Sequence, residues 1–315
     1  MTERTMAMRV TNLRDLSDCV RGVTLVAADG APLAPVTAGA HIDLHIPAFT
    51  PIVRQYSLTN APGARDAYEI AVLREPRSRG GSAYIHANLA IGDVLQVGGP
   101  RNHFAPFEAA VQSVLIAGGI GIAPIRSIAL RLQALGAPFS LHYAARSRAS
   151  AAFADDLPGS SVATCFADEA DLRLDLAALA ARTDPRAHVY CCGPARMIDA
   201  FERAFASFPS EQRHRELFEA VHAPATGGGF EITLARSGRT LRVTPGETIL
   251  EVARAAGAGV SFSCAEGVCG MCETRVLEGC PDHRDSVLTD AEQAAGNTMM
   301  ICCSGSKSAR LVLDL

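Results

Sequence analysis

The sequence CAEGVCGMC at residues 264–272 decides how the C-terminal part of this chain can fold. Four and then two residues separate its three cysteines, Cys264, Cys269 and Cys272. A tight loop would bring three thiols together and point backbone amides at the sulfurs. Gly267 and Gly270 suit that close approach of the backbone because they carry no side chain.

A Cys-x4-Cys-x2-Cys loop with a distant fourth cysteine is the plant-type ferredoxin spacing for a 2Fe-2S cluster. Two thiolates bind each iron, so four cysteines must converge. The fourth is Cys302 or Cys303, and the ending Cys302-Cys303-Ser304 resembles the Cys-x-Ser/Ala of plant-type ferredoxins. We therefore assign Cys302, with Cys303 as a packed neighbour. The alternatives are a zinc site, for which this triplet is unusual, and reduced core cysteines.

The composition is that of a folded protein outside the membrane. Hydrophobic residues make up 48% and charged residues 20%, which is a normal globular balance. The net charge of -4 gives no basic field for nucleic acid, and no apolar run reaches the length of a membrane span. The N-terminus lacks the features of a signal peptide. We therefore expect a cytoplasmic monomer, in which ten cysteines indicate redox or metal chemistry rather than disulfides.

Three segments of different texture predict a multidomain chain. Residues 1–105 carry short β-rich runs broken by Gly and Pro, which indicate an all-β barrel or sandwich. Residues 106–226 alternate strands with helices, which predicts an α/β domain with a parallel sheet. Residues 227–315 read as two strands, a helix and then the cysteine loop, as in an α+β domain. The composition of residues 222–229, HAPATGGG, predicts a flexible linker.

A flavin-binding pattern stands in the first segment. Arg54-Gln55-Tyr56-Ser57 resembles the Arg-x-Tyr-Ser signature of the ferredoxin–NADP reductase superfamily. There, an arginine would bind the flavin phosphate, the tyrosine ring would lie against the isoalloxazine, and the serine hydroxyl would hydrogen-bond near N5, where hydride arrives. Taken alone, these residues also fit an ordinary barrel strand.

A second glycine-rich pattern supports the flavin interpretation. Arg79-Gly80-Gly81-Ser82 precedes the expected helix AYIHANL. Exposed amides and a serine at a helix N-terminus bind phosphate well. The same residues also fit a simple helix cap, and both roles are compatible.

Two turns of the middle segment are candidates for the nicotinamide site. Residues 118–124, GGIGIAP, follow a buried strand and begin a helix, but they are not the Rossmann G-x-G-x-x-G fingerprint. They resemble the superfamily's nicotinamide-domain loop, in which Gly119, Gly121 and Pro124 would lie beside the pyrophosphate. Cys192-Gly193-Pro194 resembles the superfamily's Cys-Gly-Pro turn, whose cysteine lies against the nicotinamide ring. The alternatives are a tight strand–helix turn and a buried, inert cysteine.

The order of the three segments resembles the phthalate dioxygenase reductase family, which includes the vanillate O-demethylase reductases. Pro100–Phe104, His214–Phe218 and the tail 308–315 resemble family sequences as well. The resemblance implies an antiparallel β-barrel flavin domain, a nicotinamide domain and a β-grasp ferredoxin domain. It implies FMN, NADH and a 2Fe-2S cluster as cofactors and a Rieske-type terminal oxygenase as partner.

The resemblance also implies roles for single residues. Ser57 and Cys192 would lie nearest the transferred hydride, and no side chain needs to act as acid or base. Glu216 and Phe218 would close over the flavin or the nicotinamide. The predicted function is the reductase component of an aromatic oxygenase or O-demethylase. The alternatives are a reductase for a cytochrome P450 or a carnitine-type monooxygenase, and a redox sensor without enzymatic activity.

The nucleotide preference is left open by the residues. Arg146 and Ser147 follow the strand HYAA, where the ribose of the nucleotide would lie. An acid there would bind a free 2'-hydroxyl, whereas arginine can bind a 2'-phosphate. The family resemblance implies NADH, and Arg146 keeps NADPH as an alternative.

Overall fold

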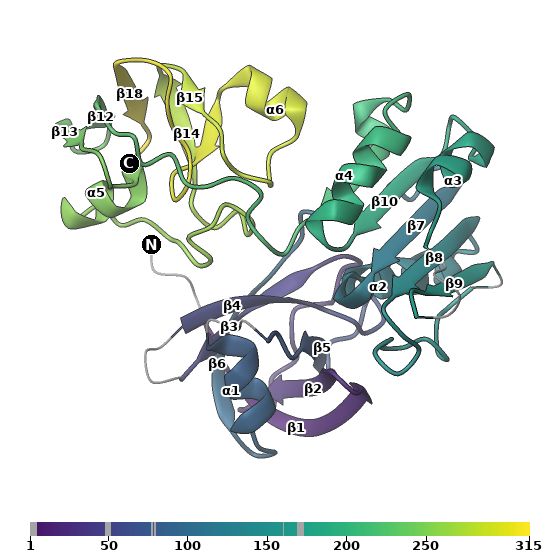
Figure 1. Ribbon diagram of the computed structural model, residues 1–315. Coiled ribbons are helices and arrows are strands. Elements are labelled where there is room, and N and C mark those ends of the chain that lie inside the picture. The colour runs from purple at the N-terminus through teal and green to yellow at the C-terminus, as the bar shows by residue number, and fades with distance from the viewer. Residues whose placement is uncertain (1–4, 48–51, 77, 79, 160, 169–172) are drawn as a thin grey trace. The chain divides into compact units, whose positions relative to one another are not determined.

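Three large sheets of different kinds follow one another in the computed structural model, and a two-stranded sheet accompanies the third (Figure 1). The structure describes residues 5–47, 52–76, 78, 80–159, 161–168 and 173–315. Arg79 lies outside the described residues. The chain divides into two compact units, and the second of these is Leu217–Leu315. The domain boundaries near 105 and 226 stay predictions. Within the described residues, no helix is both long and apolar enough to cross a membrane.

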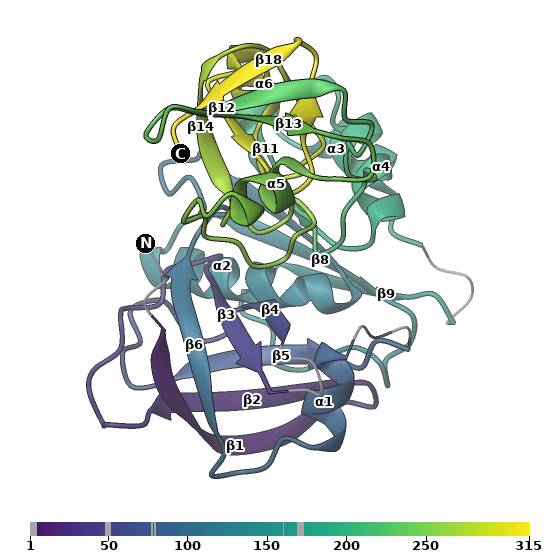
Figure 2. The ribbon, with the colours of Figure 1, turned by 90° about the vertical axis from the view of Figure 1, so that its left-hand side faces the viewer.

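The β-rich first segment forms a closed barrel (Figure 2). Its sheet has the order β4-β3-β6-β1-β2-β5, and all neighbouring strands are antiparallel. A bridge between Leu58 and Ile70 joins the two edges, which closes the sheet. The elements are β1 (Met6–Ser17), β2 (Val20–Ala27), β3 (His41–Ile46), β4 (Ile52–Ser57), β5 (Tyr68–Leu73), α1 (Gly81–Ala87) and β6 (Val94–Arg101).

The barrel core follows the two-residue period of its strands. Alternate side chains point inward because successive residues of a strand face opposite sides. The buried set includes Met8, Val10, Val23, Leu25, Ile42, Leu44, Leu95 and Val97.

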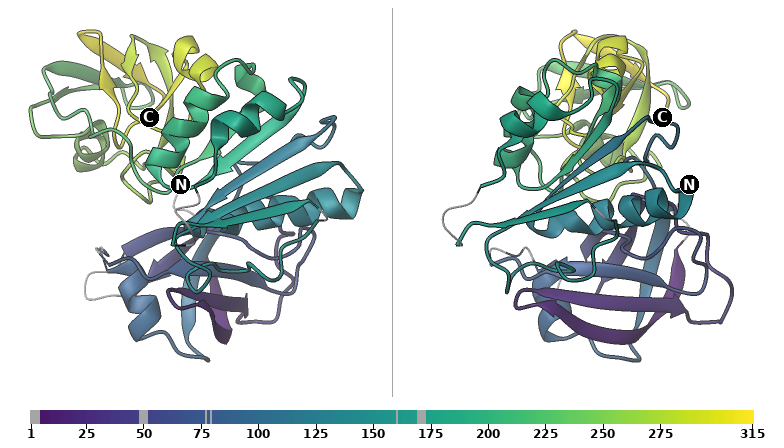
Figure 3. Two further views of the ribbon diagram at one scale, coloured as in Figure 1. Left: turned by 45° about the vertical axis from the view of Figure 1, so that its right-hand side comes forward. Right: turned by 90° about the vertical axis from the view of Figure 1, so that its right-hand side faces the viewer.

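The middle segment forms a parallel sheet with helices on both faces. Its strand order is β11-β10-β7-β8-β9, and α2 covers one face while α3 and α4 lie on the other (Figure 3). The chain order reverses between β7 and β10, and ligands bind such sheets at that point, beyond the carboxyl ends of the strands. The elements are β7 (Ser113–Gly118), η1 (Gly119–Gly121), α2 (Ile122–Leu135), β8 (Phe139–Ala145), β9 (Val162–Phe166), α3 (Leu176–Arg182), β10 (His188–Cys192), α4 (Ala195–Ala204), η2 (Ser210–Gln212) and β11 (Arg213–Glu216).

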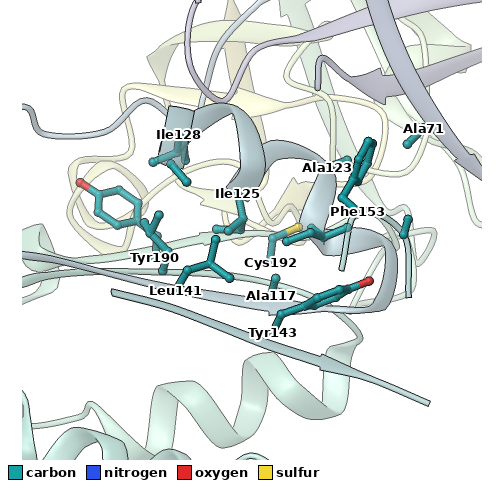
Figure 4. Packing of buried hydrophobic residues seen from close by; sticks show 14 of the residues in the cluster. Ala71, Ala117, Ala123, Ile125, Ile128, Leu141, Tyr143, Phe153, Tyr190 and Cys192 are labelled. Atoms are coloured by element: carbon teal, nitrogen blue, oxygen red, sulfur yellow. The ribbon is translucent and has the colours of Figure 1, made fainter. Parts of the chain in front are cut away.

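Barrel and parallel sheet share one hydrophobic core. Figure 4 shows Ile125 and Ile128 of α2 above Leu141 and Tyr190 of the sheet. Ala71 of the barrel strand β5 belongs to the same buried cluster. The two segments therefore pack as one unit.

The third segment has the mixed sheet expected for a β-grasp domain. Its order is β13-β12-β18-β14-β16, in which β12 and β18 pair in parallel and the other neighbours are antiparallel. Capping boxes at Thr248 and Thr289 begin its two helices. The elements are β12 (Phe230–Leu234), β13 (Arg239–Val243), α5 (Ile249–Ala255), β14 (Glu273–Glu278), β15 (Pro281–Asp282), α6 (Asp290–Ala295), β16 (Thr298–Met300), β17 (Gly305–Ser306) and β18 (Arg310–Leu313).

The linker predicted at 222–229 is partly fixed to this unit. The amide of Ala225 donates to the carbonyl of Cys303 at 2.7 Å, and the amide of Gly246 donates to the carbonyl of Thr226 at 2.8 Å. A Cβ on Gly305 would lie only 2.8 Å from the Cβ of Ala225. Composition predicted flexibility because it contains no information on these backbone contacts.

Candidate functional site

The turn that follows β10 lies so close to the end of β7 and the loop after it that these positions require glycine. A Cβ on Gly121 would lie 2.1 Å from the carbonyl oxygen of Cys192, and one on Gly118 would lie 2.7 Å from Sδ of Met197. A Cβ on Gly193 would lie 3.1 Å from Cα of Gly118. The two turns therefore touch through backbone atoms, and the structure brings both nicotinamide-site candidates together at the switch point of the sheet.

Three further candidates border these turns. Gly119 has a φ of 54°, a conformation that glycine adopts without strain. Pro124 is buried in the first turn of α2. Pro194 precedes α4, where a missing backbone N–H costs no helical hydrogen bond.

The residues after β8 differ in how freely they can meet a ligand. Ser147 is engaged locally, since its amide donates to Oγ of Ser150 at 3.1 Å. Arg148 is paired with Asp155 at 3.2 Å. Arg146 is exposed at the carboxyl end of the strand. Of these two arginines, Arg146 is therefore the better candidate for binding the ribose end of a nucleotide.

Cys192 and Glu216 lie side by side in the register of β10 and β11. The Cys192 side chain is completely buried, and burial raises the pKa of its thiol well above the usual value. Burial also raises the pKa of the Glu216 carboxyl to about 8. Oε2 of Glu216 has no hydrogen-bond partner within the described residues. At neutral pH both groups are therefore uncharged, and the carboxyl can donate a hydrogen bond.

Arg54 lies across the start of α1. A Cβ on Gly81 would lie 2.8 Å from Cγ of Arg54, so the absence of a side chain lets the arginine pass close to the helix. Gly80, just before the helix, has a φ of 102°. The hydroxyl of Ser82 donates to Oγ of Ser78 at 3.0 Å. A guanidinium and the first amides of a helix thus lie together, as phosphate binding requires.

The rest of the flavin-signature strand is anchored in the barrel. Tyr56 packs against the barrel core, and burial raises the pKa of its phenol. Ser57 is buried at the end of β4, opposite His41 of β3. Nε2 of Gln55 donates to Oδ1 of Asp43 at 2.6 Å.

The sequence did not single out Asp43 as a member of this site. Its side chain is fully buried, and Arg101 pairs with it in addition to Gln55. A buried acid with a cation and an amide donor holds the ends of β3, β4 and β6 in register. The available signal in the strand HIDLHI was an acid between two apolar residues, Ile42 and Leu44.

Two hydrogen bonds join the residues that follow the flavin-signature strand to the helix that follows the nicotinamide loop. Nη1 of Arg126 donates to the carbonyl of Thr59 at 2.6 Å, and Oγ of Ser127 donates to the carbonyl of Asn60 at 3.3 Å. Thr59 and Asn60 follow β4, and both donors belong to α2. Since the glycine loop begins α2, the two candidate sites are held in one rigid arrangement.

The four predicted cluster ligands lie together in the second unit. The thiol of Cys264 interacts with those of Cys269 and Cys302, and the thiol of Cys272 interacts with that of Cys302. Loop amides point at the sulfurs, since Glu266 donates to Sγ of Cys264 at 3.3 Å. Within the described residues, no group of three or more His, Cys, Asp or Glu side chains has an arrangement that could hold a metal ion. Four thiols with amide donors fit a 2Fe-2S cluster.

Cys303 lies on the other side of the loop. Its Sγ contacts the carbonyl of Met300 at 3.7 Å. A Cβ on Gly267 would lie 2.4 Å from the same sulfur. Cys303 thus packs beneath the loop, while Cys302 lies with the other thiols. Phe218, the last candidate, lies near the start of the second unit and is 39% exposed.

Comparison with known proteins agrees with this arrangement. The model of the 2Fe-2S iron-sulfur cluster binding domain matches residues 232–306. The phenoxybenzoate dioxygenase subunit beta of Ectopseudomonas oleovorans is 55% identical over 92% of this chain and 90% of its own length. A solved phthalate dioxygenase reductase, described as modular for electron transfer from pyridine nucleotides to [2Fe-2S], is 36% identical over 99% of this chain and 98% of its own, with a TM-score of 0.72.

The chain belongs to the phthalate dioxygenase reductase family. This confirms the predicted fold class and the family resemblance, and it makes the chain an oxidoreductase that transfers electrons within an oxygenase system. An intact type IV self-sufficient cytochrome P450 monooxygenase is also similar, with 41% identity and a TM-score of 0.91. This chain covers 41% of that longer protein, so the likeness concerns only part of it.

Proposed function

We propose that this chain is the reductase component of a two-component, Rieske-type aromatic oxygenase or O-demethylase, and that it passes electrons from NADH through FMN and a 2Fe-2S cluster. The observation that carries the proposal is the pair of hydrogen bonds from Arg126 and Ser127, which join helix α2, after the nicotinamide loop, to the residues that follow the flavin-signature strand. When bound, a flavin accepts hydride and releases single electrons, which is the conversion that an iron–sulfur cluster requires.

Arg54 and the start of α1 would hold the flavin phosphate. The guanidinium provides a forked donor, and amides at the start of the helix would add further N–H groups. Gly81 keeps this position open because it has no side chain. Tyr56 would lie against the ring system, and Ser57, at the end of the same strand, would direct its hydroxyl to the reacting edge.

The turns after β7 and β10 would hold the nicotinamide nucleotide. Gly119 and Gly121 let a phosphate approach the backbone closely. The buried Cys192 would present an uncharged thiol to the ring. Glu216, which stays protonated to about pH 8, would donate a hydrogen bond without placing a negative charge beside the transferred hydride. Positioning of the two rings, rather than acid–base catalysis, would then govern the rate.

The relatives support the choice of partner. A dioxygenase subunit is 55% identical over nearly the whole chain, which supports an aromatic oxygenase as the electron acceptor. We further propose a Rieske centre in that partner, a monomeric reductase and a cytoplasmic location. The cytochrome P450 likeness supports a haem acceptor as the second candidate.

Spectroscopy of the purified full-length chain tests the proposal. Visible absorption of flavin and cluster should bleach on anaerobic addition of NADH, and acid extraction should release FMN. Electron delivery is then measured with a Rieske oxygenase encoded near this chain and with a cytochrome P450. A colourless protein would refute the cofactor assignment, whereas reduction of the P450 alone would replace the Rieske partner.

A further inference from the structure

A buried histidine–aspartate pair lies behind the cysteine loop. The Asp285 side chain has no exposed surface, and the His283 side chain is 6% exposed. Nδ1 of His283 lies 3.6 Å from Oδ1 of Asp285, which is too long for a hydrogen bond. Neither of these atoms, nor Nε2 of His283, has a hydrogen-bond partner within the described residues. Buried polar groups are normally satisfied, so the pair requires an explanation.

The segment that carries the pair connects the two parts of the cysteine site. The amide of Ser286 donates to the carbonyl of Gly267, inside the cysteine loop, at 2.9 Å. The amide of Arg284 donates to Oγ of Ser304, two residues after Cys302, at 3.2 Å. The residues on either side of Asp285 therefore bond to the loop with three cysteines and to the turn with the fourth.

Asp285 is held close to the cysteine loop in one orientation. A Cβ on Gly267 would lie 3.1 Å from Cα of Asp285. The second carboxylate oxygen, Oδ2, accepts the amides of Val287 at 3.2 Å and Leu288 at 2.9 Å. The neighbouring Arg284 is bound to Asp282 instead, at 2.8 Å. Oδ1 is thus left facing the histidine ring.

We propose that Asp285 and His283 set the reduction potential of the 2Fe-2S cluster. The inference rests on the proposed function, since it requires that the four thiols hold the cluster. Reduction adds one negative charge to the cluster, and a carboxylate buried against Gly267 of the cysteine loop opposes that gain. The polar ring of His283, whose Nδ1 lies 3.6 Å from Oδ1 of Asp285, reduces the opposition. Because the pair is shielded from water, its field acts more strongly than that of a surface charge.

Three variants of the full-length chain test this proposal by EPR-monitored redox titration. Asp285→Asn removes the charge but keeps an oxygen that accepts the two amides, so we expect a higher midpoint potential. Asp290→Asn makes the same change at an exposed position of α6 and should leave the potential unchanged. His283→Phe keeps a ring but removes its polar atoms, so the potential should fall.

The possible results separate this proposal from the wider one. An intact EPR signal with an unchanged midpoint potential in Asp285→Asn would overturn the role of the pair. If that variant does not hold the cluster, His283→Phe decides, and a potential at or above that of the wild type overturns the proposal. If the reduced wild-type chain gives no 2Fe-2S signal at all, the proposed function fails instead.

Discussion

Replacing Gly121 with alanine would force a methyl group into the backbone of Cys192. The new Cβ would lie 2.1 Å from the carbonyl oxygen and 2.4 Å from the carbonyl carbon, whereas ordinary contacts begin near 3.4 Å. The two turns must therefore separate by more than an ångström. Overpacking of this kind costs about 1–3 kcal/mol, and an ångström of misplacement at a reacting site costs on the order of a hundredfold in rate.

The assay is steady-state reduction of ferricyanide by NADH. In Gly121→Ala we expect kcat/KM for NADH to fall about a hundredfold, equivalent to about 2.7 kcal/mol, while the cluster spectrum stays unchanged. Gly227→Ala is the matched control, because a Cβ there meets no atom within 4 Å. A kcat/KM within about threefold of the wild type would refute the reasoning, since the turns would then not position the nucleotide.

Three further predictions concern other parts of the chain. Cys272→Ser should abolish the 2Fe-2S absorption yet retain NADH–ferricyanide reductase activity, and loss of that activity in a folded variant would contradict the modular arrangement. We expect kcat/KM to be higher for NADH than for NADPH; a strong NADPH preference that Arg146→Ala removes would reverse this. Burial raises the pKa of Glu216 to about 8 from 4.5, so the folded chain keeps a proton that the unfolded chain releases, and stability falls as pH rises between those values. Glu216→Gln should remove this loss. Measured by urea unfolding, the free energy of unfolding of the variant should rise relative to that of the wild type by at most about 1.4 kcal/mol per pH unit. If the free energy of unfolding falls equally steeply with pH in both proteins, the carboxyl does not stay protonated.

The sequence predicted those parts of the fold in which the hydrophobic pattern of a segment matches the sheet that the segment joins. Alternating apolar residues indicated the barrel, and buried strands followed by helices indicated the parallel sheet. No sequence signal marked the short strands β15 and β17. A strand of two residues, such as Pro281–Asp282, forms only because it pairs with residues distant in sequence. The linker prediction was wrong at Ala225 for the same reason, since a backbone hydrogen bond to Cys303 leaves no trace in composition.

The candidate sites were predictable to the extent that they resemble known motifs. Spacing and resemblance identified the four cysteines, the Arg-x-Tyr-Ser strand and the glycine loop. The reason for Gly121 became visible only when Cys192, far along the chain, was placed against it. Arg126 had no motif of its own, because its partner is a backbone carbonyl, that of Thr59, and any residue type carries one.

The hydrogen bond from Ala225 to Cys303 shortens the covalent tether between the two units. Residues 217–224 remain between Glu216 and that anchor, and even fully extended they span at most about 29 Å. A short tether of this kind gives its two ends an effective concentration in the millimolar range. Residues inserted before Ala225 should lower the effective concentration of the cluster at the flavin and slow internal electron transfer, whereas the step from the reduced cluster to a separate partner should be unaffected.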